Sequence, residues 1–130
     1  MNVFTRVYCR TYQGILRLAI PLLPYRTPQN LKQTARVPEL LKRNKKSRPL
    51  IVTDETLHRI GALDALKRAL SENGLQFTVY DKTVPNPTVE NAEEAAALYR
   101  AEGCDSLIGF GGGSAIDCAK AVGARIARPK

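Results

Sequence analysis

The stretch Ile108-Gly-Phe-Gly-Gly-Gly-Ser-Ala-Ile-Asp-Cys-Ala-Lys120 sets three consecutive glycines between an apolar run and a segment of helical character. Ordering glycine costs more conformational entropy than ordering a residue with a side chain. The glycines are therefore either a loose connection or a place where the backbone must come very close to something. The elements around this stretch decide between the two interpretations.

From residue 49 onward, short apolar runs alternate with helical stretches. This alternation predicts βαβ units, and hence a Rossmann-like α/β fold in which helices flank a parallel sheet. The predicted strands are 50–53, 76–80 and 105–110. The predicted helices are 37–43, a stretch after Asp54 that ends near Asn73, 89–102, and a last helix from Ser114 toward Arg128. Within the second of these, Asp64 is predicted as an internal cap after Gly61, and Thr88 is predicted to cap the third.

A polar or glycine-rich segment follows each predicted strand. These segments are Asp54 after the first strand, Pro85-Asn-Pro-Thr88 after the second, and Gly111-Gly-Gly-Ser114 after the third. Right-handed crossovers bring the carboxyl ends of parallel strands to one edge, where open α/β sheets bind ligands. Because the other two loops lie at the same edge, we interpret the glycines as a place where the backbone comes close to a ligand, not as a loose connection.

The glycine loop has the features of a phosphate-binding site. A helix that begins directly after Gly111, Gly112 and Gly113 offers unpaired N–H groups and a partial positive charge. The spacing of Gly109, Gly111 and Ser114 nearly reproduces G-x-G-x-x-G, with a hydroxyl in the third place that either caps the helix or donates to a phosphate oxygen. Alone the pattern is weak, because glycine clusters also serve tight turns.

Three further polar residues have two interpretations each. Asp54 either accepts hydrogen bonds from a ribose diol or only caps the next helix; it precedes the glycines, so the usual dinucleotide fingerprint is absent. Asn86, between two prolines, either serves a rigid turn or presents a side chain that donates and accepts. Asp117 either acts near the capping-box position of the last helix or faces substrate, and Lys120 is either solvated or paired with it.

Composition limits the chain to one modest domain. Its 130 residues are 44% hydrophobic, and the formal charge of +8 is uneven, because residues 1–50 hold eleven Lys or Arg against one acid. We expect a helical or irregular basic arm over 1–36 and a nucleotide-binding domain over 37–130. The arm lacks interleaved stacking aromatics apart from three tyrosines, so we expect a solvated face and no nucleic-acid partner.

The cysteines and the apolar run at 18–24 indicate in which cellular compartment we expect the protein. Three cysteines without C-x-x-C spacing argue against a disulfide framework or a zinc site, which favours the cytoplasm. Upstream arginines suggest a signal peptide as the alternative, but the run is too short to span a bilayer, prolines interrupt it and no cleavage pattern follows. We therefore expect no membrane partner.

Three motifs occur in the order found in a known protein family. They are Ile51-Val-Thr-Asp54, Val84-Pro-Asn-Pro-Thr-Val-Glu-Asn91 and Gly111 through Lys120. Residues 37–128 closely resemble the amino-terminal domain of the iron-containing (group III) alcohol dehydrogenases, which are related to dehydroquinate synthase and glycerol dehydrogenase. The resemblance implies a two-domain, NAD- and metal-dependent oxidoreductase that interconverts a small alcohol and an aldehyde or ketone. It also implies which residues bind the cofactor.

By the matching motifs, Asp54 would bind the adenosine ribose and favour NAD over NADP. Gly112, Gly113 and Ser114, beside Gly111, would hold the pyrophosphate. Asn86 would line the cofactor cleft, and Asp117 would lie on the nicotinamide and substrate side. No catalytic residue and no metal ligand is assigned in this chain.

The resemblance implies a metal, iron or another divalent ion, held by an Asp and three His in a helical carboxyl-terminal domain that we expect this chain to lack. The only histidine, His58, is expected to be a surface or partly buried side chain. We therefore expect a fragment, inactive alone, whose protein partner is a second copy or the missing half. The alternative is a stand-alone nucleotide-binding module without catalysis.

Overall fold

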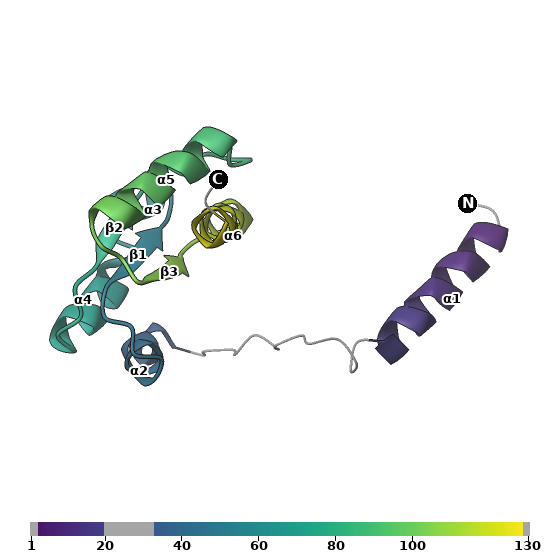
Figure 1. The fold of residues 1–130 in the computed structure, drawn as a ribbon, viewed down its shortest axis with the longest axis horizontal. Helices are drawn as coiled ribbons and strands as arrows, with labels where there is room; N and C mark the ends of the chain where they lie inside the picture. The colour runs from purple at the N-terminus through teal and green to yellow at the C-terminus, as the bar shows by residue number, and fades with distance from the viewer. Residues whose placement is uncertain (1–2, 20–32, 129–130) are drawn as a thin grey trace. The chain divides into compact units, whose positions relative to one another are not determined.

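The computed structural model describes residues 3–19 and 33–128. The chain divides into two compact units, Met1–Asn30 and Leu31–Lys130. The first unit contains the helix α1 (Val3–Ala19), and the remainder of the predicted arm up to residue 32 lies outside the described residues. The second unit holds the sheet and all the other elements in Figure 1.

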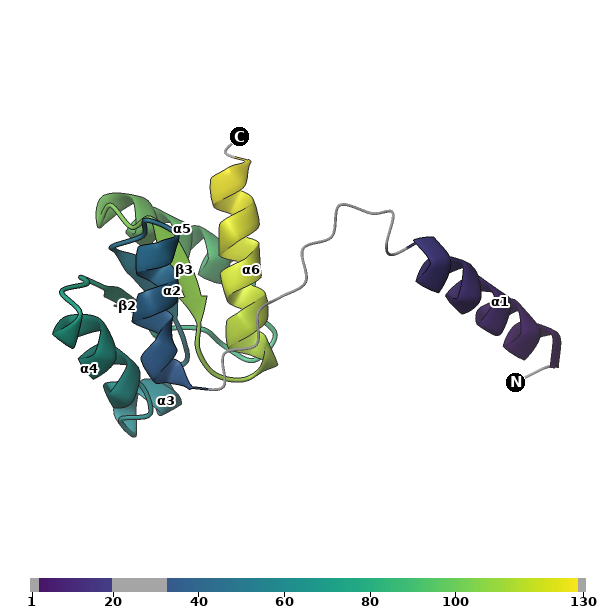
Figure 2. The same cartoon turned by 90° about the horizontal axis from the view of Figure 1, so that it is seen from below.

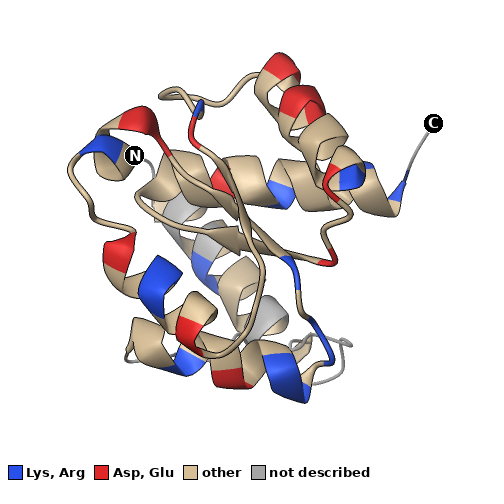
Figure 3. Ribbon diagram, turned by 90° about the vertical axis from the view of Figure 1, so that its left-hand side faces the viewer, with Lys and Arg blue, Asp and Glu red and all other residues tan. Residues whose placement is uncertain are grey.

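The second unit is built on a three-stranded parallel sheet, as the sequence predicts. Its strands are β1 (Pro49–Val52), β2 (Thr78–Tyr80) and β3 (Ser106–Gly109), in the order β2-β1-β3. Ile51 of the central strand pairs with Val79 on one side and Ile108 on the other. None of the strands carries a charged residue, and the charges lie on helices and connections (Figure 3).

Helices cover both faces of the sheet (Figures 1 and 2). The helical elements of this unit are η2 (Thr34–Arg36), α2 (Val37–Arg43), α3 (Glu55–Arg59), α4 (Asp64–Glu72), α5 (Val89–Ala101) and α6 (Gly113–Ala127). Side chains alternate along β1, so Leu50 and Val52 pack with α5 and α6, while Ile51 packs with α2 and α4. Burial on both faces explains why β1 is a continuous apolar run.

The helical stretch predicted after Asp54 is two helices rather than one. Gly61 adopts φ +76, a left-handed conformation that ends α3 and separates it from α4. The predicted cap at Asp64 was wrong by one residue, because Leu63 occupies the N-cap position and Asp64 is the first residue of α4. A carboxylate in the first turn still suits the positive end of the helix dipole.

The predicted cap at Thr88 is confirmed. Its hydroxyl accepts a hydrogen bond from the backbone N of Asn91 at 3.3 Å, and the Asn91 side chain accepts one from the Thr88 backbone at 3.4 Å. Asn91 also donates to the hydroxyl of Tyr80, which itself donates to Glu94. Burial, with a smaller contribution from Glu94, raises the pKa of Tyr80 to about 12.

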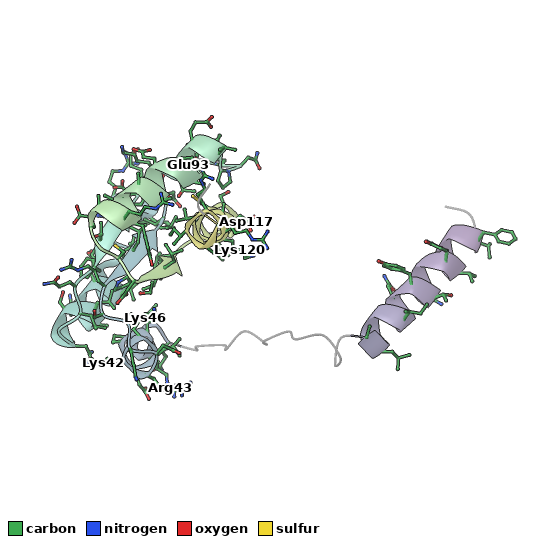
Figure 4. All side chains as sticks on the ribbon, viewed as in Figure 1. Lys42, Arg43, Lys46, Glu93, Asp117 and Lys120 are labelled. Atoms are coloured by element: carbon green, nitrogen blue, oxygen red, sulfur yellow. The ribbon has the colours of Figure 1, made fainter. Side chains whose placement is uncertain are left out.

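Glu93 and Arg125 join the two helices on one face of the sheet. Arg125 Nε lies 2.6 Å from Glu93 Oε1, between α6 and α5, with Glu93 labelled in Figure 4. Small residues bring α6 close to β3, since a Cβ at Gly109 would lie 3.2 Å from Ala119 Cβ. This close packing fixes where α6 begins relative to the edge of the sheet.

Candidate functional site

The strand order places the three predicted loops at one edge of the sheet. Each loop follows the carboxyl end of a strand, and β1 lies between β2 and β3. The loops enclose a cleft of about 390 Å³. Its lining residues are Asp54, Glu55, Thr56, Thr83, Val84, Pro85, Gly112, Gly113, Ser114 and Ala115.

Gly111 is a glycine that the fold itself requires. Its φ is +133, which residues with a side chain rarely adopt. A Cβ at this position would lie 2.8 Å from Leu57 Cδ1 and 3.3 Å from Ala115 Cβ. The same point is 3.6 Å from Asp54 Oδ2, so this tight turn brings the glycine loop against the carboxylate that follows β1.

Gly112 and Gly113 differ from Gly111, because nothing in the fold requires them to be glycine. A Cβ at either position would meet no heavy atom within 4 Å. Gly112 has φ −78, which any residue adopts, and Gly113 is the first residue of α6. Both line the cleft, so side chains here would project into open space beside it rather than into the protein.

The amino terminus of α6 meets the cleft without a side-chain cap. The helix begins at Gly113 with Gly112 as N-cap, so the predicted start at Ser114 was wrong by one residue, and the Ser114 hydroxyl is not the cap. The first backbone bond of α6 runs from Ile116 N to Gly112 O at 3.2 Å. The preceding amides, 113–115, therefore have no acceptor within the helix and favour an anion.

Asp54 caps the helix that follows it, which confirms one of its two interpretations. Its Oδ1 accepts a hydrogen bond from the backbone N of Leu57 at 2.9 Å. Its Oδ2 makes no hydrogen bond with the described residues and lies on the side of Gly111. Capping therefore occupies one oxygen and fixes the direction of the other, which leaves the ribose interpretation compatible with the geometry.

Two buried threonine hydroxyls at this edge have no hydrogen-bond partner among the described residues. Thr53 is 0% exposed and Thr83 is 6% exposed. Their backbones are joined, because Thr83 N donates to Thr53 O at 3.3 Å. Sequence reasoning missed both, since only burial and a missing partner distinguish them from other threonines. Of the two, Thr83 lines the cleft.

Asn86 and Asp117 are not among the residues that line the cleft. Asn86 is exposed and adopts φ +55, a conformation that asparagine tolerates better than most residues, which accounts for asparagine between the two prolines. Asp117 is exposed and lies 3.6 Å from Lys120 Nζ (Figure 4), so the predicted pairing is confirmed. Its capping-box interpretation was wrong, because it lies in the second turn of α6.

His58 is partly buried, as expected. Its Nδ1 lies 2.6 Å from Asp81 Oδ2, and each side chain is about one-third exposed, at 34% and 36%. Across residues 3–19 and 33–128, no three His, Cys, Asp or Glu side chains gather in a way that could hold a metal ion. Within the same ranges, no helix has the length and apolar character needed to cross a bilayer.

A larger hollow of about 570 Å³ lies at the opposite edge of the sheet. It is lined by residues near the amino ends of the strands, among them Arg48, Gln76 and Thr78. None of the predicted site residues lies there. Loop backbone, the Asp54 carboxylate and a buried hydroxyl converge instead at the smaller cleft.

A parallel sheet with helices on both faces and a glycine-lined cleft at its carboxyl edge is the arrangement of the Rossmann-like α/β domains. The model of the iron-containing alcohol dehydrogenase family matches residues 24–130, and the chain belongs to this family. The resemblance seen in the three sequence motifs is thereby confirmed.

Named relatives are oxidoreductases. The long-chain primary alcohol dehydrogenase AdhA of Thermoanaerobacter ethanolicus is 39% identical over 94 residues, which cover 72% of this chain and 24% of that protein. Lactaldehyde reductase of Escherichia coli K12 is 39% identical over 83 residues, 64% of this chain and 22% of that protein. The chain thus spans about a quarter or less of the length of these relatives.

Solved structures agree with the fold. The crystal structure of a 1,3-propanediol oxidoreductase superposes with a TM-score of 0.72 at 31% identity, covering 76% of this chain and 26% of that one. A sulfoacetaldehyde reductase from Bifidobacterium kashiwanohense, solved in complex with NAD+, superposes with a TM-score of 0.70 at 21% identity, covering 83% and 30%. At that identity the second likeness supports the fold alone.

Proposed function

We propose that the cleft at the carboxyl edge binds the pyrophosphate and adjoining ribose of NAD. The single observation that carries this proposal is that Gly112 and Gly113 line the cleft although packing does not require glycine at either position. Bare backbone beside an uncapped helix start lets a pyrophosphate approach the amides closely. Within the family, this assigns residues 33–128 the cofactor-binding part of an alcohol dehydrogenase.

The residues around the glycines match the chemistry of a dinucleotide. The amides of 113–115 and the Ser114 hydroxyl donate to phosphate oxygens. Asp54 Oδ2, held in direction by the cap on Leu57 N, accepts from a ribose diol. The same negative charge repels a 2′-phosphate, so NAD is preferred over NADP. Asn86 is proposed beside the cleft, and Asp117 on the nicotinamide and substrate side.

Thr83 extends this match. A buried hydroxyl without a partner is costly in the free protein, and a ligand oxygen in the cleft would supply the missing acceptor. We assign Thr83 Oγ1 as a donor to the sugar-phosphate part of the cofactor.

A bound nicotinamide would supply the acceptor for a hydride from an alcohol carbon, and the protein would supply placement and electrostatics. Residues described here hold and orient the cofactor. They do not form a metal site, so metal chemistry is assigned to none of them. The proposed activity of the whole enzyme is interconversion of a small alcohol and its aldehyde or ketone, in line with the names of the relatives.

Isothermal titration calorimetry with NAD tests the proposal. The informative variant is Gly113→Ala, and its matched control is Gly14→Ala, because a Cβ at either position meets nothing within 4 Å. Both variants should keep the thermal midpoint or raise it slightly, since alanine favours helix. Only Gly113→Ala should weaken NAD binding.

Two results would overturn the proposal: wild-type protein that does not bind NAD, or Gly113→Ala protein that binds it as tightly as wild type does. Binding without turnover, even when a complementary carboxyl-terminal chain is added, would instead identify a nucleotide-binding module without catalysis.

A further inference from the structure

Helix α1 (Val3–Ala19) carries a surface that the proposed cofactor site does not use. Its 17 residues include Arg6, Arg10 and Arg17 and no Asp or Glu. A surface helix of a globular domain normally carries polar groups of both signs on its outer face. A helix whose charges all have one sign needs a different explanation.

The helical register separates the charges from the apolar residues. At about 100° per residue, the positions of Arg6, Arg10 and Arg17 fall within a sector of about 40°. The positions of Phe4, Tyr8 and Ile15 fall within a similar sector, about 160° away on the opposite side. Such a separation, with arginine on one face and aromatic and aliphatic residues on the other, is typical of interfacial helices.

The apolar face is broad, and the described residues of the first unit do not cover it. Phe4 is 90% exposed, Tyr8 72% and Ile15 62%. Thr11 lies on this side but does not interrupt it, because its hydroxyl donates to the backbone oxygen of Val7 at 2.8 Å. The rings of Tyr8 and Tyr12 stack with centroids 6.5 Å apart, which presents a continuous aromatic surface.

We propose that α1 binds the surface of an anionic lipid bilayer, lying in the plane of the interface. Its apolar face would enter the headgroup boundary, where aromatic rings are favourable, while the arginine face meets anionic headgroups. Charge complementarity favours this occupant, because anionic headgroups attract the arginine face, whereas a second copy of α1 has no Asp or Glu to attract it. This proposal departs from the sequence-based expectation of no membrane partner, which was drawn from the apolar run at 18–24 and did not consider the two faces of α1.

Co-sedimentation of the full chain with vesicles tests the proposal. We expect binding to phosphatidylcholine vesicles that contain about 30% phosphatidylglycerol, and much weaker binding to phosphatidylcholine alone or at high salt. Arg10→Glu should weaken binding by about 30-fold, because one attraction becomes a repulsion. Its control is Lys46→Glu, an equal charge change at an exposed position of the second unit (Figure 4), which should have no effect.

The apolar face is tested in the same assay. Phe4→Ala should weaken binding about tenfold through lost burial, whereas Gln13→Ala on the arginine side should not. Equal binding to neutral and anionic vesicles, or equal effects of Arg10→Glu and Lys46→Glu, would overturn the proposal. So would self-association without lipid that Phe4→Ala abolishes, because a second copy would then be the occupant. NAD binding has no part in these measurements.

Discussion

Thr83→Val should make the free protein more stable and its complex with NAD weaker. Valine has nearly the shape of threonine but no hydroxyl, and the Thr83 hydroxyl is buried without a partner. An unsatisfied buried hydroxyl costs about 1–3 kcal/mol, so its removal should raise the free energy of unfolding by about 1 kcal/mol. For a domain of this size, that is an increase of roughly 4–8 °C in the melting temperature.

The opposite effect is expected on the ligand. If Thr83 donates to the cofactor, the variant loses one neutral hydrogen bond worth about 0.5–1.5 kcal/mol, which weakens NAD binding by roughly 2- to 12-fold. Differential scanning calorimetry without NAD and titration calorimetry with NAD measure the two quantities. Thr83→Ser, which keeps the hydroxyl, should retain most of the affinity.

Thr53→Val is the matched control. Thr53 has the same chemistry and is fully buried at the same edge, but it is not among the residues that line the cleft. This variant should gain stability and keep its affinity for NAD. If wild-type protein binds NAD and Thr83→Val binds it equally well, the role assigned to Thr83 is wrong while the cofactor site stands. If Thr83→Val lowers stability, the hydroxyl has a partner in the free protein.

Three further outcomes are expected. Gly111→Ala should lower the free energy of unfolding, measured in urea, by about 2 kcal/mol or more. The reasons are that a φ of +133 is strained for alanine and that the new Cβ would lie 2.8 Å from Leu57 Cδ1. A loss of stability no larger than that of Gly113→Ala would contradict this prediction. Asp54→Asn should keep the cap on Leu57 N but raise the affinity for NADP relative to NAD in titration calorimetry, and an unchanged ratio would remove the ribose contact. Because burial raises the pKa of Tyr80 to about 12, the tyrosine of the unfolded chain ionises at lower pH. The stability contributed by Tyr80 should therefore be full below pH 10 and fall by up to about 3 kcal/mol between pH 10 and 12. Tyr80→Phe should remove the last step of the phenolate absorbance titration, and persistence of that step would assign it to another tyrosine.

The sequence predicted the sheet well, because its signals are strong and local. Residues 50–52 form an uninterrupted apolar run, and such a run is explained by burial on both faces of a central parallel strand. Thr88 and Asn91 made the cap of α5 predictable for the same reason, since both partners lie within one turn. The break at Gly61 was predicted only in part, through the internal cap placed at Asp64, because an isolated glycine in a helical pattern is often tolerated.

The site was predictable as a set of loops but not as a set of contacts. No single segment of the sequence determines the strand order. The approach of Asp54 to Gly111 could not be predicted because it depends on β1 and β3 being neighbours in the sheet. The missing partner of Thr83 depends on everything packed around it, and no local pattern encodes it. Asn86 had a local cause, a left-handed backbone between two prolines, that could have been proposed from the residue type.

The three consecutive glycines have two different causes. Gly111 is glycine because the chain must turn with positive φ and pass within contact of Leu57 and Ala115. Gly112 and Gly113 have room for side chains, so packing and conformation leave their identity unexplained. A residue type that the fold does not require, placed in the lining of a cleft and at an uncapped helix start, is best explained by something that must come close to the backbone. The distinction is experimental, because alanine at position 111 should damage the protein, whereas alanine at position 113 should damage only what the protein binds.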